Sequence, residues 1–250
     1  MKWWWASALL AACSAAQATL PAQGPQRADE VLAKALARAL PQTVQGLVRV
    51  EQFEPDVLKG QVLLVVQRPA SVQFQALAPT LDLLALMSTD GTRFVGFQRG
   101  GTKCFTGPAC PRNLARLVPI ALPAPQLADA LLGRPPLLPG AASALSWDGE
   151  RQLYRVELRA GDQREDVFVR PGSFAFAGVV LYRGAERLAS LAYGEPSPQG
   201  LPGSLRYKSR GQDVSIELRD VSVDASVEPE VWAVRCPEGT QVLELSCEEP

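Results

Sequence analysis

The sequence of 250 residues contains no histidine. This absence excludes Ser-His and Cys-His nucleophile pairs, histidine metal sites and the most common general base of enzymes. A pair of carboxylates or a Ser-Lys pair could still catalyse a reaction. The remaining search for catalytic groups therefore concerns the acidic clusters.

Two short stretches concentrate acidic residues. Asp148 and Glu150 flank a glycine in SWDGE, and Asp162, Glu165 and Asp166 lie in AGDQRED. Asp-Gly is a strong hairpin signal, so we expect both stretches to be polar surface turns that join strands. The glycines of GFQRGGTKCFTG lack the spacing of a phosphate-binding loop and predict another hairpin turn. The sequence therefore predicts that the protein is not an enzyme.

The chain also lacks a run of charges of one sign. It has 25 basic and 26 acidic side chains, for a formal net charge of −1. Nucleic-acid-binding proteins need a basic footprint, and the sequence shows none. It also has no polybasic patch that would hold it on a membrane. We therefore expect no nucleic-acid partner, and we expect membrane attachment to depend on a covalent lipid.

The apolar run at the N-terminus is too short to cross a bilayer, which takes about 20 such residues. It starts at Trp3 behind Lys2 and ends at small residues, which is the build of a secretory signal peptide. Residues 10–13, Leu-Ala-Ala-Cys, resemble the lipobox of bacterial lipoproteins. This resemblance implies cleavage after residue 12 and acylation of Cys13. The alternative is an ordinary signal peptide cut a few residues later, with Cys13 discarded.

The chain after the signal peptide divides by composition. Residues 13–27 are small, polar and proline-containing, and we expect the lipidated N-terminus to be followed by a flexible tether. Residues 28–225 hold the expected domain, and residues 226–250 form a C-terminal extension. The cofactor expected is none, apart from the covalent lipid on Cys13.

Four cysteines remain after Cys13, and an even count in a secreted chain suggests disulfides. We expect the pairing of sequence neighbours, Cys104 with Cys110 and Cys236 with Cys247. Each of these would close a short loop worth about 2 to 3 kcal/mol on the chain-entropy model. The alternative is a four-cysteine zinc site, but the sequence has no CxxC spacing. We expect no metal.

Local patterns predict a mostly β protein with a few helices. From Ala28 to Leu40, apolar residues recur at helical spacing and predict an amphipathic helix that ends near Pro41. Residues 113–133 predict two short helical pieces, with Gly133 as a candidate C-cap. The remaining runs are short, bounded by Gly or Pro, and closely spaced, which favours an antiparallel meander and an α+β fold. The expected strands are GLVRVEQF, GQVLLVVQRP, SVQFQALAP, TRFVGFQRG, KCFTG, LYRVELR, REDVFVRP, FAGVVLYRG, RLASLAYGE, GSLRYKSR and DVSIELRDVSVD.

Several of these strands are apolar on both faces. In QVLLVVQ one face carries Val62, Leu64 and Val66, and the other carries Leu63 and Val65. A sheet with one face in water should alternate more cleanly. Either packing helices or a cavity for an apolar ligand must therefore cover the second face.

Taken together, the lipobox, the N-terminal amphipathic helix and the order of the strands resemble the bacterial LolA/LolB lipoprotein carriers, most closely the lipid-anchored receptor LolB. The resemblance is carried by FQALAP, STDGTRF, LPAPQLADALLGRPP and LPGSLRYKSRGQDVSIELRDVSVD, and it spans residues 28–225. It implies an incomplete antiparallel β-barrel whose helices form a lid over an apolar cavity that receives acyl chains. The candidate cavity lining is Leu64, Val66, Val72 and Phe74.

The resemblance also points to a membrane-insertion loop. In LolB an exposed leucine follows the proline of a loop between strands, whereas here Thr80 follows Pro79. The candidate insertion residues come directly after it: Leu81, Leu83, Leu84 and Leu86. The alternative is that these leucines pack inside the protein in a short helix or strand.

The implied function is transfer. A protein anchored at the periplasmic face of the bacterial outer membrane would accept acylated lipoproteins from a soluble periplasmic LolA-like carrier and pass them to the bilayer. Ser14 favours this membrane, because an aspartate there would resemble an inner-membrane retention signal. Its partners would be membrane lipid and the lipoproteins. The alternatives are a structural or assembly lipoprotein that reuses the fold, and a carrier of another apolar ligand.

Overall fold

The structure is a computed structural model that describes residues 19–54, 58–116 and 118–248. The predicted signal peptide and Cys13 lie outside these residues. Three helices and a 3-10 turn accompany the strands in the described chain. They are α1 (Ala28–Leu36), α2 (Pro111–Leu114), α3 (Ala124–Leu131) and η1 (Pro229–Val231).

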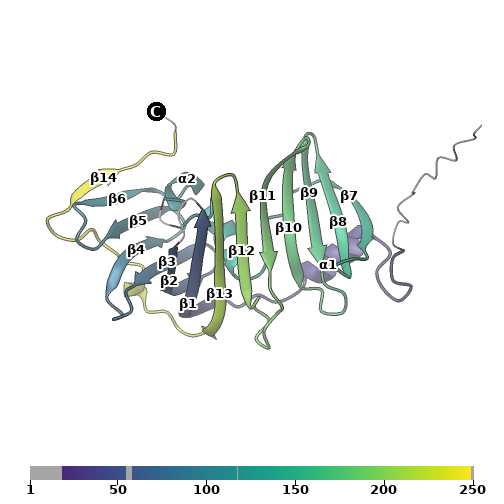
Figure 1. Ribbon diagram of the computed structural model, residues 1–250, viewed down its shortest axis with the longest axis horizontal. Coiled ribbons are helices and arrows are strands. Elements are labelled where there is room, and N and C mark those ends of the chain that lie inside the picture. Colours follow the sequence, from purple (N-terminus) through teal and green to yellow (C-terminus); the bar gives the residue numbers. More distant parts are fainter. Residues whose placement is uncertain (1–18, 55–57, 117, 249–250) are drawn as a thin grey trace, which may run out of the picture.

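Fourteen strands form a single sheet within the described residues, in the order β14-β6-β5-β4-β3-β2-β1-β13-β12-β11-β10-β9-β8-β7. Neighbouring strands are antiparallel except for β14 and β6, which are parallel. The sheet ends at β14 and β7 and does not close, so the expected open antiparallel sheet is confirmed (Figure 1). The strands are β1 (Thr43–Glu54), β2 (Leu58–Gln67), β3 (Ser71–Leu77), β4 (Leu83–Thr89), β5 (Arg93–Gln98), β6 (Lys103–Pro108), β7 (Ala142–Asp148), β8 (Leu153–Ala160), β9 (Gln163–Val169), β10 (Phe176–Arg183), β11 (Glu186–Tyr193), β12 (Ser204–Ser209), β13 (Gln212–Val223) and β14 (Gln241–Glu244).

The helices cover the inner face of the curved sheet. Helix α1 contacts β7 and β8, and α3 contacts β2 and β3. The expected helix begins at Ala28 and buries Val31 and Ala35, but it ends at Leu36 and not near Pro41. Helix α3 ends at a glycine as expected. Gly133 has φ +93, a backbone conformation that a residue with a side chain would adopt only with strain. Its N–H donates a hydrogen bond to the carbonyl of Ala130.

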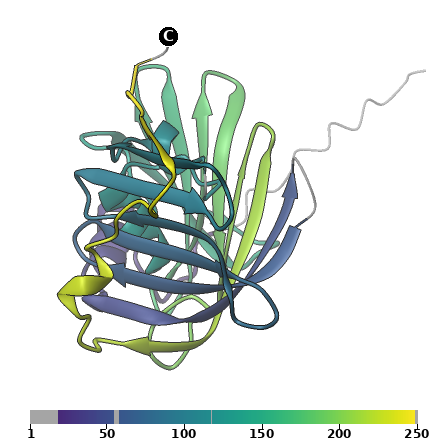
Figure 2. The ribbon, with the colours of Figure 1, turned by 90° about the vertical axis from the view of Figure 1, so that its left-hand side faces the viewer.

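The C-terminal segment, residues 226–248, covers the outer face of the sheet opposite α3. Figure 2 shows this yellow segment crossing the blue strands on their outer side. A small apolar cluster forms beneath it, in which Leu86, Phe97 and Cys104 pack against Val234 and Cys236. The strands that are apolar on both faces are therefore covered on both: by α3 and its flanking segments on the inside, and by the C-terminal segment on the outside.

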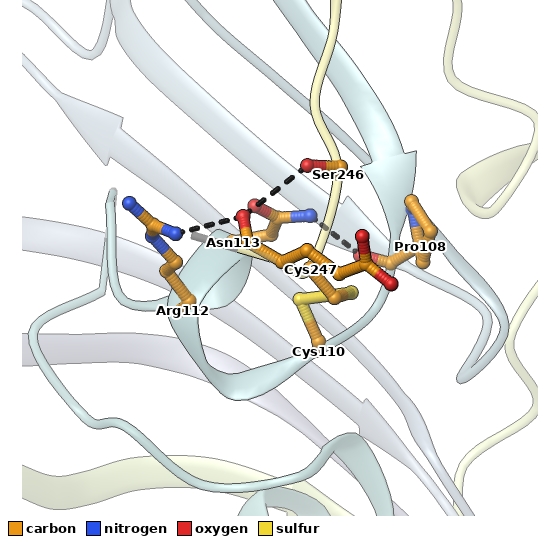
Figure 3. The surroundings of a disulfide bond; sticks show 7 residues. Pro108, Cys110, Arg112, Asn113, Ser246 and Cys247 are labelled. Carbon is orange, nitrogen blue, oxygen red and sulfur yellow. Dashed lines mark hydrogen bonds between the residues drawn. A yellow bond between two sulfur atoms is a disulfide. The ribbon is translucent and has the colours of Figure 1, made fainter. Parts of the chain in front are cut away.

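The disulfides join the C-terminal segment to the sheet. Cys104 pairs with Cys236, and Cys110 pairs with Cys247 (Figure 3), so the expected pairing of sequence neighbours is wrong. The reason is that β6 is extended. From Cys104 to Pro108 alone the strand rises about 13 Å, beyond the reach of a disulfide. The parallel pairing of β14 with β6 instead brings Cys247 close to Cys110, and Cys236 meets Cys104 where the C-terminal segment crosses the outer face of the sheet.

The surface position expected for Glu165 and Asp166 is also wrong. Asp162 lies in the turn between β8 and β9, but Glu165 and Asp166 lie within β9 and are buried. Glu165 accepts a hydrogen bond from the N–H of Leu138 at 2.8 Å, and burial raises the pKa of its carboxyl. Asp166 accepts one from Arg155 at 2.9 Å. Both carboxylates thus have structural partners.

Two further findings concern membrane attachment. The described end of the predicted tether lies against the domain, because Leu20 packs on the main core and Pro25 is buried. Within the described residues no helix is both long and apolar enough to cross a membrane.

Candidate functional site

The loops β3–β4 and β5–β6 lie at one end of the sheet, together with the end of β1 at Glu54 and the start of β2 at Leu58, because these strands are antiparallel and paired in sequence order. We call this the hairpin end. Two hollows lie there and share four wall residues, Val50, Val62, Ala76 and Pro119. We call them together the apolar cavity. The smaller hollow has a volume of about 70 Å³ and the larger one about 760 Å³. The larger volume is within the range of ligand pockets.

The walls of the apolar cavity come from five strands, β1 to β4 and β13, mostly at inward-facing positions, and from the segment after α2. Facing residues of β1, β2 and β3 are Val50, Gly60, Val62 and Ala76 in the strand register. Small residues leave the space open: a Cβ added to Gly60 would meet no atom within 4 Å. The smaller hollow is lined by Val50, Val62, Phe74, Ala76, Ala85, Leu86, Met87, Val118, Pro119, Val214 and Ile216.

The segment from α2 to α3 closes the cavity on its helical side. Val118 and Pro119 face the smaller hollow, and Pro119 also faces the larger one. Leu114 and Ile120 flank them and are almost completely buried in the main core. These two anchors hold the segment across the sheet, so that it covers the cavity.

The predicted lining residues all face inward but divide in position. Phe74 lines the smaller hollow. Leu64, Val66 and Val72 are completely buried in the main core and line neither hollow. The sequence missed Val50, Val62, Ala76 and Pro119. These residues could have been identified from the sequence, because they lie nearer the hairpin end and include small side chains that leave space.

The predicted insertion leucines divide between a loop and a strand. Leu81 lies in the β3–β4 loop, whereas Leu83, Leu84 and Leu86 lie in β4, which corresponds to the alternative of a short strand. Leu81 is 62% exposed and Leu84 is 50% exposed. Leu83 is half-buried and Leu86 buried, and both pack in the outer cluster. Leu58, at the start of β2, is 60% exposed and was missed.

Hydrogen bonds fix the loop that carries Leu81. The N–H of Ala78 donates to the carbonyl of Asp82 at 2.8 Å, and the N–H of Leu81 donates to the carbonyl of Ala78 at 2.8 Å. The Asp82 carboxylate accepts from the Thr80 hydroxyl at 2.8 Å and pairs with Arg99 at 3.2 Å. These two partners lower the pKa of Asp82. The carboxylate therefore stays charged and Leu81 stays outside.

The smaller hollow has apolar walls, whereas the larger one is also lined by Arg49, Glu51, Gln52, Lys59 and Gln61. Lys59 and Glu51 form an ion pair of 3.3 Å at the larger hollow. In the part of the chain that the structure describes, no group of three or more Cys, Asp or Glu side chains could hold a metal ion. The arrangement therefore suits the binding of an apolar chain.

No protein-family model matches this sequence, and no curated protein matches it. Solved structures with a similar fold include three bacterial proteins. A LolA superfamily protein from Nitrosomonas europaea has a TM-score of 0.53 and 12% identity, covering 83% of this chain and 98% of its own. A DUF1329 family protein from Desulfovibrio piger has a TM-score of 0.54 and 11% identity, covering 82% and 95%. A domain from Vibrio parahaemolyticus, described as an outer-membrane lipoprotein-sorting protein, has a TM-score of 0.50 and 7% identity, covering 81% and 94%. These similarities show that the chain has a LolA-like fold.

Proposed function

We propose that this protein is a LolB-like lipid-anchored receptor that binds the acyl chains of lipoproteins in the apolar cavity and passes them to the outer membrane. One observation carries the proposal: the apolar cavity lies at the end of the sheet where Leu58, Leu81 and Leu84 are exposed. The lipobox resemblance at Cys13 supports anchoring, and the LolA-like fold supports the ligand class.

The energetics explain why a cavity and exposed leucines belong together. Each methylene moved out of water is worth about 0.8 kcal/mol, so long acyl chains must stay covered throughout a transfer. Leucines that enter the bilayer beside the cavity would let a chain leave the protein directly into hydrocarbon. Transfer would need no covalent chemistry, only a lower free energy of the chains in the membrane.

The test is photolabelling of the full purified chain in mild detergent. The probe is a triacylated peptide with a photoreactive group at the end of one acyl chain, and the cross-linked residues are mapped by mass spectrometry. We expect labels on Val50, Val62 and Ala76, with competition by triacylated peptide and none by the unacylated peptide. Absence of label from these residues would overturn the proposal and favour a structural lipoprotein.

A further inference from the structure

A third hollow lies at the hairpin end, between the β5–β6 tip and the segment after α2. Its volume is about 430 Å³. We call it the cationic hollow, because its two charged side chains, Lys103 and Arg116, are both positive. It is lined by Phe97, Gln98, Gly101, Thr102, Lys103, Phe105 and Arg116.

The two cations of this hollow are available to a ligand. Two other cations of the hairpin end are neutralised: Lys59 pairs with Glu51, and Arg99 pairs with Asp82. Within the described residues, neither Lys103 nor Arg116 forms an ion pair. Both side chains are exposed. Two like charges that face one hollow without a carboxylate favour an anion between them.

The lining also fixes the geometry of the site. The Arg116 guanidinium carbon lies 5.9 Å from the centre of the Phe105 ring, within the range of a cation–π interaction. Thr102 supplies a hydroxyl, whereas the Phe97 ring packs in the outer apolar cluster on the other face of the sheet. Guanidinium, ammonium and hydroxyl groups are the donors that bind phosphate oxygens, while aromatic walls suit the apolar atoms that adjoin a headgroup.

The cationic hollow lies within reach of the apolar cavity. Arg116 precedes Pro119 by three residues, which span at most about 11 Å when extended. Pro119 lines both parts of the apolar cavity. A lipid could therefore place its headgroup against Lys103 and Arg116 and its acyl chains against Pro119 and Ala76.

We infer that the cationic hollow binds the headgroup of a lipid with a net negative charge, so that the ligands of this protein include anionic phospholipids. This inference rests on the proposed function, because it assigns the acyl chains of the same lipid to the apolar cavity. It goes beyond it, because the acylated end of a lipoprotein carries no phosphate. The hollow thus adds a charge-selective subsite to a site that otherwise selects only apolar chains.

The test uses the full chain in micelles of a neutral detergent. The probes are phosphatidylglycerol and phosphatidylcholine, each with a photoreactive group at the end of one acyl chain. We expect both to label Val62 and Ala76, with phosphatidylglycerol half-saturating at a concentration roughly 25-fold lower, since each cation near an anionic lipid contributes about fivefold. The preference should shrink at high salt, because the cations are exposed.

Charge reversal tests whether Lys103 and Arg116 cause the preference for phosphatidylglycerol. The double variant Lys103→Glu/Arg116→Glu should lose it while still taking label from phosphatidylcholine, which shows that the variant is folded. The matched control, Arg210→Glu/Arg235→Glu, reverses two exposed arginines outside the hollow and should keep it. Retention of the preference in the first variant, or its loss in the control, would overturn the inference.

Two further outcomes separate the possible causes of failure. Equal labelling of the apolar cavity by both lipids would overturn the headgroup inference and leave the proposed function standing, whereas no labelling of the cavity by either would overturn both. Glycerol 1-phosphate serves as a soluble competitor. If it displaced phosphatidylglycerol at the concentration at which that lipid itself binds, the anion would be a free phosphate, and the assignment to a lipid would be wrong.

Discussion

Cys104 and Cys236 are separated by 132 positions in the sequence, yet their Cα atoms lie 5.7 Å apart across a disulfide. Cys104 is completely buried in the outer apolar cluster, and Cys236 covers it. A few residues after Cys236, β14 pairs with β6, the strand that contains Cys104, and beyond it Cys110 joins Cys247. The C-terminal segment is therefore fixed to the sheet at both ends of β14.

The two disulfides interleave along the chain, and this arrangement predicts a non-additive loss of stability. Either disulfide alone closes a loop of more than 100 residues, worth about 5 kcal/mol on the chain-entropy model. Once one is closed, the other adds only a ring of about 17 residues, worth about 3 kcal/mol. We expect Cys104→Ser/Cys236→Ser and Cys110→Ser/Cys247→Ser each to lose about 3 kcal/mol in free energy of unfolding, measured in guanidinium, and the quadruple variant about 8 kcal/mol. A quadruple loss equal to the sum of the two pairs would contradict this arrangement.

Local patterns predicted the elements that depend on neighbours in sequence. The apolar spacing from Ala28 specified α1, and Gly100 lies in the β5–β6 turn that its sequence predicted. Strand β4 was left open between a membrane-facing loop and a short packed helix or strand, because its run of leucines does not alternate. Strand β14 was missed because it is short and forms only on the edge of β6, more than 100 residues away.

The candidate site was only partly predictable for a related reason. Alternation placed Leu64 and Phe74 on one face of the sheet, but whether an inward position is packed or open depends on where α3 lies against β2 and β3. Helix α3 covers the end that holds Leu64 and leaves space near Ala76. The burial of Glu165 depends in the same way on Leu138, a contact between distant segments.

Filling the apolar cavity should block acyl binding. In Ala76→Phe the added ring enters the space shared by the two hollows, so photolabelling by the triacylated probe should fall about tenfold or more. The free energy of unfolding should change by less than about 1 kcal/mol, because the ring fills existing space. Ala144→Phe, at an exposed position of β7, is the control and should leave labelling unchanged. Undiminished labelling of Ala76→Phe would mean that the chains bind elsewhere.

The exposed leucines should act on transfer and not on folding. Leu81→Glu/Leu84→Glu changes two exposed side chains, so the free energy of unfolding should stay within about 1 kcal/mol of the original. Delivery of the triacylated probe to liposomes should slow about tenfold or more, because a carboxylate resists entry into the bilayer. Leu36→Glu, an exposed leucine on α1, should leave delivery unchanged. Unchanged delivery by the double variant would remove these leucines from the mechanism.

Leu86 lies in the same strand as Leu84, but we expect its substitution to affect folding. It lies in the outer cluster beneath the C-terminal segment and is 8% exposed. Leu86→Glu should therefore lower the free energy of unfolding by several kcal/mol, because it buries an unpaired carboxylate. A variant as stable as the original would show that the C-terminal segment does not cover this position in solution.

The buried carboxylate Glu165 should make stability depend on pH. Burial raises its pKa in the folded protein, so the protonated form is favoured there and stability falls as pH rises from about 4 through the raised pKa. Glu165→Gln keeps an oxygen for the Leu138 N–H and removes this loss. We expect the variant to match the original at pH 4 and to be more stable at pH 8, measured by denaturant unfolding. Asp213→Asn should show the opposite sign, because hydrogen bonds from Arg206 lower the pKa of Asp213 and stabilise its charged form. A difference between Glu165→Gln and the original that did not vary with pH would show that this carboxyl titrates in the folded protein as it does in the unfolded chain.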